Sequence, residues 1–464
     1  MSTASFTDAE IQSATGAARS GPVPAAAFPA VCTDTRSLVP GCLFVALKGE
    51  RFDAHDFLPA ALAGGAAALV VEQGRAVPVG ATAYAVADTL AALGALARHH
   101  RRRFRLPLGA VGGSNGKTTT KEMVAAILGT RGPSLKTEGN LNNEVGLPLT
   151  LLRLAPGHVA GVVELGMNRA GEMTRLARVA EPDAAVITVV QPEHLEGLGS
   201  IEGVAAAEGE LFRALPAHAT AVVNLDDPHV VAQAVGLQKR LTFGRAQGAD
   251  VQLLEVESRG RDGITAHVRA AGAEHAVRLH FLGEHNAQNA AAAFALGLAL
   301  GYRPEECRAG LEAARPYARR LNVLDAPGGV TVIDDCYNAN PASMEAALCV
   351  LDELAPGGRA FAVLGDMLEL GQTEREDHVA LGKLAGKKAD VLAFFGPRSA
   401  DGCAADVTGV RRHFTDVEPL VKWLRELLQP GDVVLVKGSR GMRLERVVAA
   451  LTGQAAPATG GHGP

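Results

Sequence analysis

The sequence has little that would indicate a membrane protein, a secreted protein or a metal-binding cysteine cluster. No apolar run is long enough to span a bilayer, and Met1 to Glu10 has no basic stretch followed by an apolar one. The six cysteines include no Cys-x-x-Cys pair, and no histidine cluster has zinc spacing. We therefore expect a cytoplasmic chain without membrane insertion, whose thiols are reduced and mostly structural.

The sequence also lacks an excess of positive charge. The formal net charge is −5, and no long basic run exists apart from the one that includes His99 to Arg103. This run closes a predicted helix, where the helix dipole favours cations, so we interpret it as a solvated helix end. We therefore do not expect this chain to bind nucleic acid. No heptad seam is present either, so we expect a monomer.

The composition is that of an ordinary globular protein, with 47% hydrophobic and 20% charged residues in 464. That length suggests about three domains. Breaks in the pattern predict domains at 1–105, 106–320 and 321–453. The remaining residues, 454–464, are small residues, glycine, proline and one histidine, and we expect them to be disordered.

A glycine-rich stretch from Gly112 to Thr120, called the phosphate loop, is the strongest motif. An apolar run, Leu106 to Val111, precedes it as a buried strand would, and Lys121 to Leu128 follows with helical spacing. A strand, a glycine turn and a helix N-terminus present N–H groups to phosphate, with Lys117 on the terminal phosphates and Thr118 on magnesium. The first glycine comes one position later than the strict pattern requires, so an ordinary turn is the alternative. The expected nucleotide-binding residues of the loop are Gly113, Ser114, Asn115, Gly116, Lys117, Thr118 and Thr119.

Strands and helices alternate between residues 106 and 320, which predicts a mainly parallel sheet covered by helices. Ligands bind beyond the carboxyl ends of such strands, where Glu164 and His194 fall. With Lys117 and Thr118 nearby, Glu164 is favoured as a magnesium ligand over a capping carboxylate. Between residues 250 and 281, apolar and polar side chains alternate instead, which predicts antiparallel strands appended to the sheet. The polar start of the helix at 286–300 is interpreted as capping.

The two outer segments also have an α/β pattern. In the first, polar stretches at Asp34 to Ser37 and Lys48 to His55 lie beside apolar strands, although each taken singly indicates a turn. The third segment resembles a small nucleotide-binding fold without a glycine fingerprint. Its polar groups gather after the predicted strands, as a substrate cleft requires. Its strand candidates are Val330 to Ile333, Ala360 to Leu364, Val391 to Phe395 and Val433 to Val436.

Taken together, the motifs resemble the Mur ligases, ATP-dependent amide-forming enzymes of peptidoglycan precursor synthesis. Within the family the likeness is to the branch that adds D-alanyl-D-alanine to UDP-N-acetylmuramoyl-tripeptide. The Asp-Asn-Pro-Arg motif of the branch that adds the third residue is missing. The resemblance covers the chain up to its tail and rests on these stretches: Gly113 to Thr118, Gly139 to Pro148, Glu164 to Asn168, His194 to Glu196, His285-Asn286 with Asn289, Asp335 to Pro341, and Leu364 to Met367.

The resemblance implies an α/β protein of three domains: a small N-terminal α/β domain, a central and mainly parallel phosphate-loop sheet, and a Rossmann-like C-terminal domain. It implies ATP and Mg²⁺ as cofactors. By matching position, the uridine nucleotide would be held by Thr35, Arg36, Ser37, Asp53 and His55. ATP would be contacted by Asn289, Arg320 and Asp335 beside the phosphate loop, and Mg²⁺ by Thr118, Glu164 and His194. The remaining expected substrate residues are Asn140, Asn143, Tyr337, Asn338, Asn340 and Asp366.

The implied reaction has two steps. The tripeptide carboxylate attacks the γ-phosphorus of ATP to give an acyl phosphate, and the dipeptide amine then displaces phosphate. The first step brings anions together and requires cations and oriented donors, with Lys117 and His194 as expected catalytic residues. The α-amino group is already partly neutral at cytoplasmic pH, so no strong base is required. Both diaminopimelate and lysine are possible third residues of the tripeptide.

Two positions depart from the family. Members usually carry a lysine fourteen residues after the equivalent of His194, which is carbamylated to make an anionic metal ligand, whereas this chain has Glu208. We expect Glu208 to supply that carboxylate, as a catalytic and metal-binding residue; the alternative is that it faces solvent. Arg319-Arg320 replaces a Gly-Arg pair, so either arginine could face ATP. A Mur ligase that adds another amino acid and an inert nucleotide-binding module are the competing functions.

Overall fold

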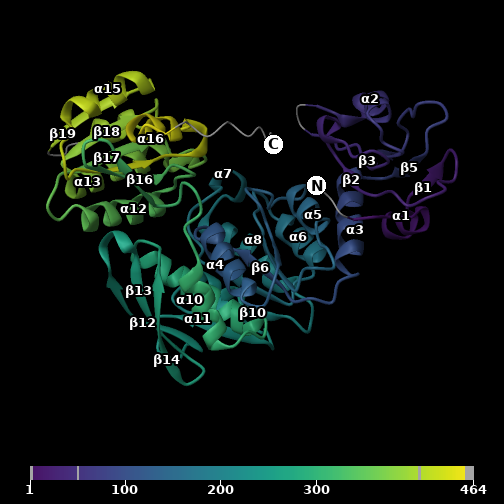
Figure 1. The fold of residues 1–464 in the computed structure, drawn as a ribbon, viewed down its shortest axis with the longest axis horizontal. Coiled ribbons are helices and arrows are strands. Elements are labelled where there is room, and N and C mark those ends of the chain that lie inside the picture. The colour runs from purple at the N-terminus through teal and green to yellow at the C-terminus, as the bar shows by residue number, and fades with distance from the viewer. Residues whose placement is uncertain (1–3, 50–51, 406–408, 455–464) are drawn as a thin grey trace.

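The computed structural model describes residues 4–49, 52–405 and 409–454, in three sheets that form three lobes. The N-terminal and C-terminal lobes lie on opposite sides of the central lobe (Figure 1). The sheets are mostly parallel and covered by helices, which confirms the predicted α/β class. The predicted disorder of the tail concerns residues that, apart from Gln454, lie outside those described. No helix among the described residues is both long and apolar enough to cross a bilayer.

The N-terminal lobe has a five-stranded sheet in the order β1-β5-β4-β3-β2, in which only β1 runs antiparallel to its neighbour. In this segment the sequence predicts a helix at Leu58 to Gly64 and a strand at Ala67 to Val71, and both are confirmed to within one residue. The sequence also predicts Asp88 as the N-cap of the last helix of this lobe, and this is confirmed, because its side chain accepts from the N–H groups of Leu90 and Ala91. The elements are α1 Asp8–Thr15, β1 Ala18–Ser20, β2 Val31–Cys32, η1 Thr35–Ser37, β3 Leu43–Val45, η2 Ala54–Phe57, α2 Leu58–Ala63, β4 Ala68–Glu72, β5 Ala83–Val86 and α3 Thr89–Arg101.

The basic end of α3 is only partly solvated, so that interpretation is wrong for two of its residues, whereas Arg102 and Arg103 are exposed as expected. His100 and Arg101 are buried: His100 Nε2 lies 3.0 Å from the Leu154 carbonyl oxygen, and Arg101 donates to the carbonyl oxygen of Leu106. On the outer side, Arg98 and Arg102 both pair with Glu181. Helix α3 packs against helices of the central lobe, so its cations lie at the joint between two lobes.

The central lobe has a nine-stranded sheet in the order β14-β13-β12-β11-β10-β9-β6-β8-β7. Strands from β7 to β12 along this order are parallel, and β12, β13 and β14 are antiparallel, which confirms the predicted appended strands. The elements are β6 Leu108–Gly112, α4 Lys117–Gly129, β7 Ser134–Lys136, α5 Gly146–Leu151, β8 Ala160–Glu164, α6 Glu172–Ala180, β9 Ala184–Ile187, α7 Leu195–Leu198, α8 Ile201–Arg213, β10 Thr220–Asn224, α9 Pro228–Gln233, β11 Arg240–Gly244, β12 Val251–Ser258, η3 Gly260–Asp262, β13 Ile264–Ala270, β14 Ala273–Leu279, α10 Glu284–Ala299 and α11 Pro304–Ala313.

Two separate cores cover the faces of this sheet. Helices α4, α10 and α11 pack together on one face in a cluster rich in alanine and leucine. Side chains of α6 and α8 pack on the other face and share a cluster with α3 and the N-terminal sheet. The N-terminal and central lobes therefore share a continuous core.

The C-terminal lobe has a six-stranded sheet in the order β15-β16-β20-β17-β18-β19, parallel except for β15. The four strands expected in this region are present, and two edge strands were not predicted, β15 and β19. Their side chains are mostly exposed or half-buried, so they lack the apolar run that indicates a buried strand. The elements are β15 Asn322–Ala326, β16 Val330–Asp335, α12 Pro341–Leu354, β17 Ala360–Gly365, η4 Gly371–Thr373, α13 Glu374–Lys388, β18 Val391–Phe395, α14 Ala400–Cys403, β19 Val410–Phe414, α15 Val417–Leu427, β20 Val433–Lys437, η5 Arg440–Met442 and α16 Glu445–Thr452.

Candidate active site

The phosphate loop joins β6 to α4 and can be built only with glycine at two positions. Gly113 and Gly116 have φ values of +114° and +81°. A Cβ on Gly113 would lie 2.2 Å from Thr188 Oγ1, and one on Gly116 would lie 2.2 Å from Asn289 Oδ1. The helix begins at Lys117, earlier than the predicted run from residue 121, so Lys117, Thr118 and Thr119 form its first turn. Their position gives an anion the N–H groups and dipole of a helix N-terminus.

Lys117 is held over the loop by its own backbone and by a carboxylate. Its Nζ donates to the carbonyl oxygens of Gly113 and Ser114 and lies 3.4 Å from Glu193 Oε1. Burial alone would lower the pKa of Lys117, but the nearby carboxylates, Glu193 first and then Glu208 and Glu164, raise it above the ordinary lysine value. Lys117 is therefore a fixed cation at neutral pH.

Glu164 ends β8 and has one oxygen free for a further partner. The side-chain amide of Asn142 donates to its Oε1 at 2.8 Å, and its backbone N–H donates to Thr137 Oγ1 at 2.9 Å. Its Oε2 is buried without a hydrogen-bond partner. A buried carboxylate oxygen is costly to leave unpaired, so this atom fits a bound cation.

The donor set around Glu164 suits Mg²⁺ that also binds phosphate. Among the described residues, no group of three or more His, Cys, Asp or Glu side chains is arranged to hold a metal ion. Mg²⁺ commonly takes one or two protein ligands and fills the rest of its octahedron with water and phosphate oxygens. Glu164 and the Thr118 hydroxyl fit this description.

Glu208 does not face solvent, so that alternative is wrong. Its side chain, on α8, is buried, and its Oε2 accepts a 2.8 Å hydrogen bond from the N–H of Gly113. Burial raises the pKa of Glu208 to about 7, opposed by Lys117 and reinforced by Glu193. Glu208 therefore holds the backbone of the phosphate loop through Gly113, and it lies close enough to Lys117 to interact with its charge.

His194 links the central lobe to the C-terminal lobe. Its Nδ1 lies 3.1 Å from Oε2 of Glu369, and both residues have left-handed backbone conformations, with φ of 51° and 67°. The hydrogen bond with Glu369 raises the pKa of His194, while burial opposes the rise. His194 therefore faces the carboxylate of another lobe.

Two further contacts connect the phosphate loop to the C-terminal side. The side-chain amides of Asn115 and Asn340 bond to each other, and Asn340 also caps α12. Arg320 Nη2 lies 3.4 Å from Thr118 Oγ1. Arg319 instead pairs with Glu445, so the structure puts Arg320, and not Arg319, at the phosphate loop.

Asn289 also contacts the phosphate loop, which overturns the capping interpretation of the start of α10. Gly283 is the N-cap residue, and no side chain caps this helix. Asn289 Oδ1 instead accepts from Thr120 Oγ1 at 3.4 Å, and its Nδ2 donates to Asn286.

Two residues expected to bind ligands, Asp335 for ATP and Asp366 for substrate, already have protein partners. Asp335 accepts from the N–H of Leu321 and pairs with Lys437 at 2.6 Å, and it is 6% exposed. Asp366 is 2% exposed and accepts from the N–H of Ser399. Both carboxylates brace loops at the carboxyl edge of the C-terminal sheet. Tyr337 is half-buried beside them, and Asn338 is exposed.

The two expected asparagines of the loop between β7 and α5, Asn140 and Asn143, lie on either side of Asn142 in the sequence, and no hydrogen bond among the described residues joins either side chain to Glu164. Asn143 Oδ1 accepts from the N–H groups of Val145 and Gly146, so its side chain shapes the turn. The Asn140 carbonyl oxygen accepts from the N–H of Asn142. The neighbouring Asn142, which was not predicted, is the residue that contacts Glu164.

The expected uridine-nucleotide residues lie in the N-terminal lobe, away from the phosphate loop (Figure 1). Thr35, Arg36 and Ser37 form η1, and Arg36 pairs with Asp34. Asp53 caps η2 and bonds to His55, whose Nε2 accepts from the N–H of Glu72. Asp53 and His55 thus stiffen the loop, and no contact in the described residues joins this set to the phosphate loop.

Sequence reasoning gave no individual role to several residues that matter in this geometry. They lie within the motifs or in the polar stretches that follow the predicted strands, and none has a distinctive spacing of its own. They are Asn142, Gln191, Glu193, Glu369, Lys437 and Arg440.

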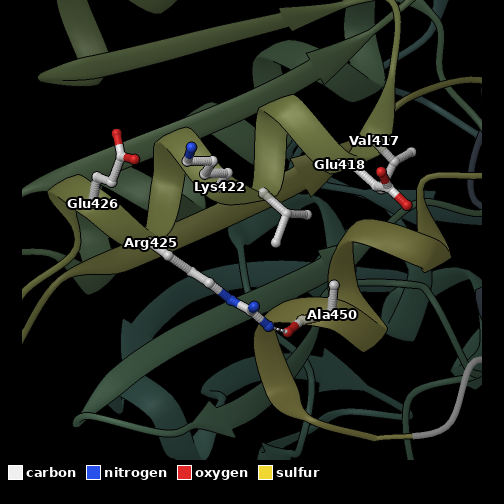
Figure 2. Close-up of a pocket in the computed structure, with 7 residues that line it drawn as sticks. Val417, Glu418, Lys422, Arg425, Glu426 and Ala450 are labelled. Carbon is white, nitrogen blue, oxygen red and sulfur yellow. Dashed lines mark hydrogen bonds between the residues drawn. The ribbon is translucent and has the colours of Figure 1, made fainter.

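A surface groove of about 510 Å³ between α15 and α16 does not belong to this site. Its side chains come from the outer helices of the C-terminal lobe, and Arg425 crosses it to the carbonyl oxygen of Ala450 at 2.5 Å (Figure 2). Lys422 and Glu426 point away from Ala450, so no polar groups converge there. At the phosphate loop, by contrast, polar side chains from several elements meet.

The fold and the site together define a nucleotide-dependent ligase of three lobes, and comparison gives its family. Residues 28–101 match the model described as Mur ligase family, catalytic domain. Residues 111–297 match the Mur ligase middle domain, and residues 319–440 match the model described as Mur ligase, glutamate ligase domain. The chain belongs to the Mur ligase family.

Within that family, the similar curated relatives carry one name. The chain is 41% identical to UDP-N-acetylmuramoyl-tripeptide:D-alanyl-D-alanine ligase of Escherichia coli K12 over 91% of this chain and 93% of the relative. It is 38% identical to the enzyme of that name from Bacillus subtilis 168, over 90% and 92%.

Solved structures agree. A crystal structure of MurF from Acinetobacter baumannii has a TM-score of 0.91 at 33% identity, covering 98% of this chain and 100% of that one. MurF ligase from Thermotoga maritima, solved in complex with ADP, has a TM-score of 0.83 at 31% identity, with 91% and 97% covered.

Proposed function

We propose that this chain is an ATP-dependent ligase of peptidoglycan synthesis that joins D-alanyl-D-alanine to UDP-N-acetylmuramoyl-tripeptide. The products are the UDP-linked pentapeptide, ADP and phosphate. One observation carries the proposal beyond the names of the relatives: loops on the C-terminal side reach the phosphate loop, through Asn340 to Asn115 and Arg320 to Thr118. A nucleotide held by one lobe would therefore meet an acceptor held by the other.

In the first step, the tripeptide carboxylate attacks the γ-phosphorus of ATP and displaces ADP, giving an acyl phosphate. Both reactants are anions, so the site must offset their repulsion. Lys117, held charged by its carboxylate neighbours, and Arg320 supply positive charge, and the first turn of α4 supplies N–H donors. Mg²⁺, when bound through Glu164 and Thr118, would neutralise further phosphate charge. His194 is proposed as a further ligand once it leaves Glu369.

In the second step, the dipeptide amine attacks the acyl carbon and phosphate leaves. The amine needs a lone pair, and an α-amino group with a pKa near 8 is partly neutral at pH 7. The residues therefore need only to hold the amine near the acyl carbon and keep out water, which would hydrolyse the acyl phosphate.

The roles of the other site residues remain proposals. Asn289, Arg320 and Asp335 are proposed for ATP, and Thr35, Arg36, Ser37, Asp53 and His55 for the uridine nucleotide. Because Asp53, His55, Asp335 and Asp366 have protein partners already, we infer that these four act mainly by shaping the loops that hold substrate. A cytoplasmic location and a monomeric state also remain predictions.

We further propose that Glu208 is the built-in carboxylate that replaces a carbamylated lysine. Support comes from its burial, its bond to the Gly113 N–H and its nearness to Lys117. An aspartate or glutamate needs no carbon dioxide to become an anion, so this site would be independent of bicarbonate.

The function is tested by phosphate release from ATP with UDP-N-acetylmuramoyl-tripeptide, with and without D-alanyl-D-alanine. We expect turnover that depends on the dipeptide, with the pentapeptide product identified by mass. Turnover only with a different amino acid would support another Mur ligase activity. ATP binding without turnover on any acceptor would support an inert module and contradict the proposal.

A further inference from the structure

Arg440 lies on the loop after β20, at the edge of the C-terminal sheet that faces the phosphate loop. We propose that its guanidinium binds the terminal carboxylate of the incoming dipeptide and so helps to select an acceptor of two residues. This inference rests on the proposed function, and it gives a specific role to one residue of the polar stretch that follows the last predicted strand of the third segment.

Most cations around this edge already have carboxylate partners. Arg398 pairs with Glu374 at 2.6 Å, Lys437 with Asp335 at 2.6 Å, and Arg319 with Glu445 at 3.5 Å. In the described part of the chain, Arg440 has no carboxylate within ion-pair distance. Its side chain is exposed, and the one hydrogen bond that it donates, to the Tyr337 hydroxyl, is long at 3.5 Å. Most of its donors therefore remain available to a ligand.

Tyr337 connects Arg440 to the phosphate loop. The Arg440 Cζ lies 5.5 Å from the centre of the Tyr337 ring, and the Arg320 Cζ lies 4.4 Å from it. Arg320 in turn reaches Thr118. Two arginines that have no carboxylate partner among the described residues thus contact one aromatic ring, and one of them, Arg320, also reaches the phosphate loop.

This arrangement fits an acceptor with an amine at one end and a carboxylate at the other. The amine must reach the acyl phosphate beside Lys117 and Thr118, while the carboxylate must be bound farther away. Two residues span at most about 7 Å, and one residue spans about half of that. Arg440, one aromatic ring beyond Arg320, suits the longer acceptor, because a single amino acid held there would leave its amine short of the reaction.

Arginine is also the appropriate residue type for this task. Its planar guanidinium presents paired N–H groups that match the two oxygens of a carboxylate. The ring of Tyr337 restricts the guanidinium through the cation–π contact, so less freedom is lost on binding. The negative charge of the acceptor would also offset the repulsion between Arg440 and Arg320.

The test compares wild type, Arg440→Gln and Arg443→Gln with two acceptors, D-alanyl-D-alanine and its C-terminal amide. Arg443 is the matched control, because it is exposed, lies in the same loop and has no carboxylate partner among the described residues. Wild type and Arg443→Gln should prefer the acid. Arg440→Gln should raise KM for the acid roughly 10- to 100-fold, leave KM for ATP unchanged and lose the preference for acid over amide. Arg440→Lys should recover part of the preference for the acid, because lysine restores the positive charge but lacks the paired N–H groups of a guanidinium.

The outcomes separate this inference from the proposed function. If wild type does not use D-alanyl-D-alanine at all, the proposed function fails. If wild type is active and Arg440→Gln still prefers the acid as strongly as wild type does, the function stands and the role of Arg440 is wrong. A rise in KM for ATP in place of the dipeptide would also overturn it, because Arg440 would then serve the nucleotide.

Discussion

The side-chain amides of Asn115 and Asn340 donate hydrogen bonds to each other, at 3.0 and 3.3 Å, between the phosphate loop and the C-terminal lobe. Asn115 lies in the turn of the phosphate loop, and Asn340 caps α12. The same Asn115 amide also donates to Gln191 Oε1. The position of the C-terminal lobe is therefore coupled to the loop that would hold the phosphates, which is what a reaction shared between lobes requires.

Substitution of Asn340 should separate this coupling from helix capping. Asn340→Ser keeps an oxygen that can cap α12 but removes the amide bonds to Asn115, so we expect near wild-type stability and about tenfold lower kcat/KM. Asn340→Ala removes the cap as well and should cost about a further 1 kcal/mol of unfolding free energy. Kinetics and chemical unfolding of both variants provide the measurement. Wild-type kcat/KM in Asn340→Ser would show that the amide pair does not contribute to turnover.

Removal of the Glu208 carboxylate should impair the reaction without any response to bicarbonate. Glu208→Ala leaves the Gly113 N–H unpaired and removes a carboxyl group beside Lys117, so we expect about 10- to 100-fold lower activity. Wild-type turnover should be the same in bicarbonate-depleted and bicarbonate-supplemented buffer. Glu208→Gln keeps an acceptor for Gly113 and tests whether the charge itself matters. Unchanged turnover in both variants would discard the proposed role.

Substitution by lysine gives a sharper version of this test. If the site can use a carbamylated lysine, Glu208→Lys should be nearly inactive without bicarbonate and recover when bicarbonate is restored. Recovery would show that a carboxylate is needed at this position, whatever its origin. Glu210→Lys, two residues away on α8, is a control for the added charge.

The sequence could predict the phosphate loop because that motif depends on local chemistry. Glycines with positive φ, a preceding strand and a following helix all lie within a short stretch. The same holds for the Asp88 cap and for the appended antiparallel strands, whose alternation is visible in the residues. Edge strands such as β19 could not be predicted, because exposed strands need no apolar side chains.

Contacts between distant segments were beyond sequence reasoning. The pairs Asn115–Asn340 and His194–Glu369 join residues far apart in the chain, and no periodicity links them. The basic run at the end of α3 was misinterpreted for the same reason, since its partners Glu181 and Asp183 come from the central lobe. Resemblance to a family supplied the candidate residues, and the structure was needed to show which are open to ligand.

Loss of the Glu164 charge should weaken Mg²⁺ binding. Its Oε2 is buried and unpaired, so Glu164→Gln replaces a cation ligand with an amide of the same size. We expect the Mg²⁺ concentration for half-maximal activity to rise about 10- to 100-fold. A second readout is the Mg²⁺-dependent shift in unfolding temperature with ADP bound, which should shrink in the variant. Asn142→Ala, which only removes the hydrogen bond to Oε1 of Glu164, should have a smaller effect. If Glu164→Gln needs no more Mg²⁺ than wild type, the metal is held by other ligands.

His285 should make the protein sensitive to acid. Burial at the boundary with the C-terminal lobe lowers the pKa of His285 to about 4, with Asp335 opposing and Lys437 adding to the effect. The unfolded chain, with an ordinary histidine pKa near 6.5, then binds more protons than the folded one between about pH 4 and 6.5. The contribution of His285 to stability is therefore complete above about pH 6.5 and is lost as the pH falls toward 4. Because the side chain keeps part of its surface exposed, we expect a total of about 1 to 3 kcal/mol.

The measurement is the unfolding free energy at pH 7 and pH 5 for wild type and for His285→Asn, which cannot titrate. Carboxylates lose stability in acid in both proteins, so only the difference between them reports on His285. The variant should lose about 1 to 2 kcal/mol less than wild type over this interval. His218→Asn, at an exposed histidine of the central lobe, is the matched control. Equal losses of unfolding free energy in wild type and His285→Asn would contradict this prediction, because the acid sensitivity would then come from carboxylates alone. In that case His285 would meet enough water or negative charge at the lobe boundary to keep its ordinary pKa.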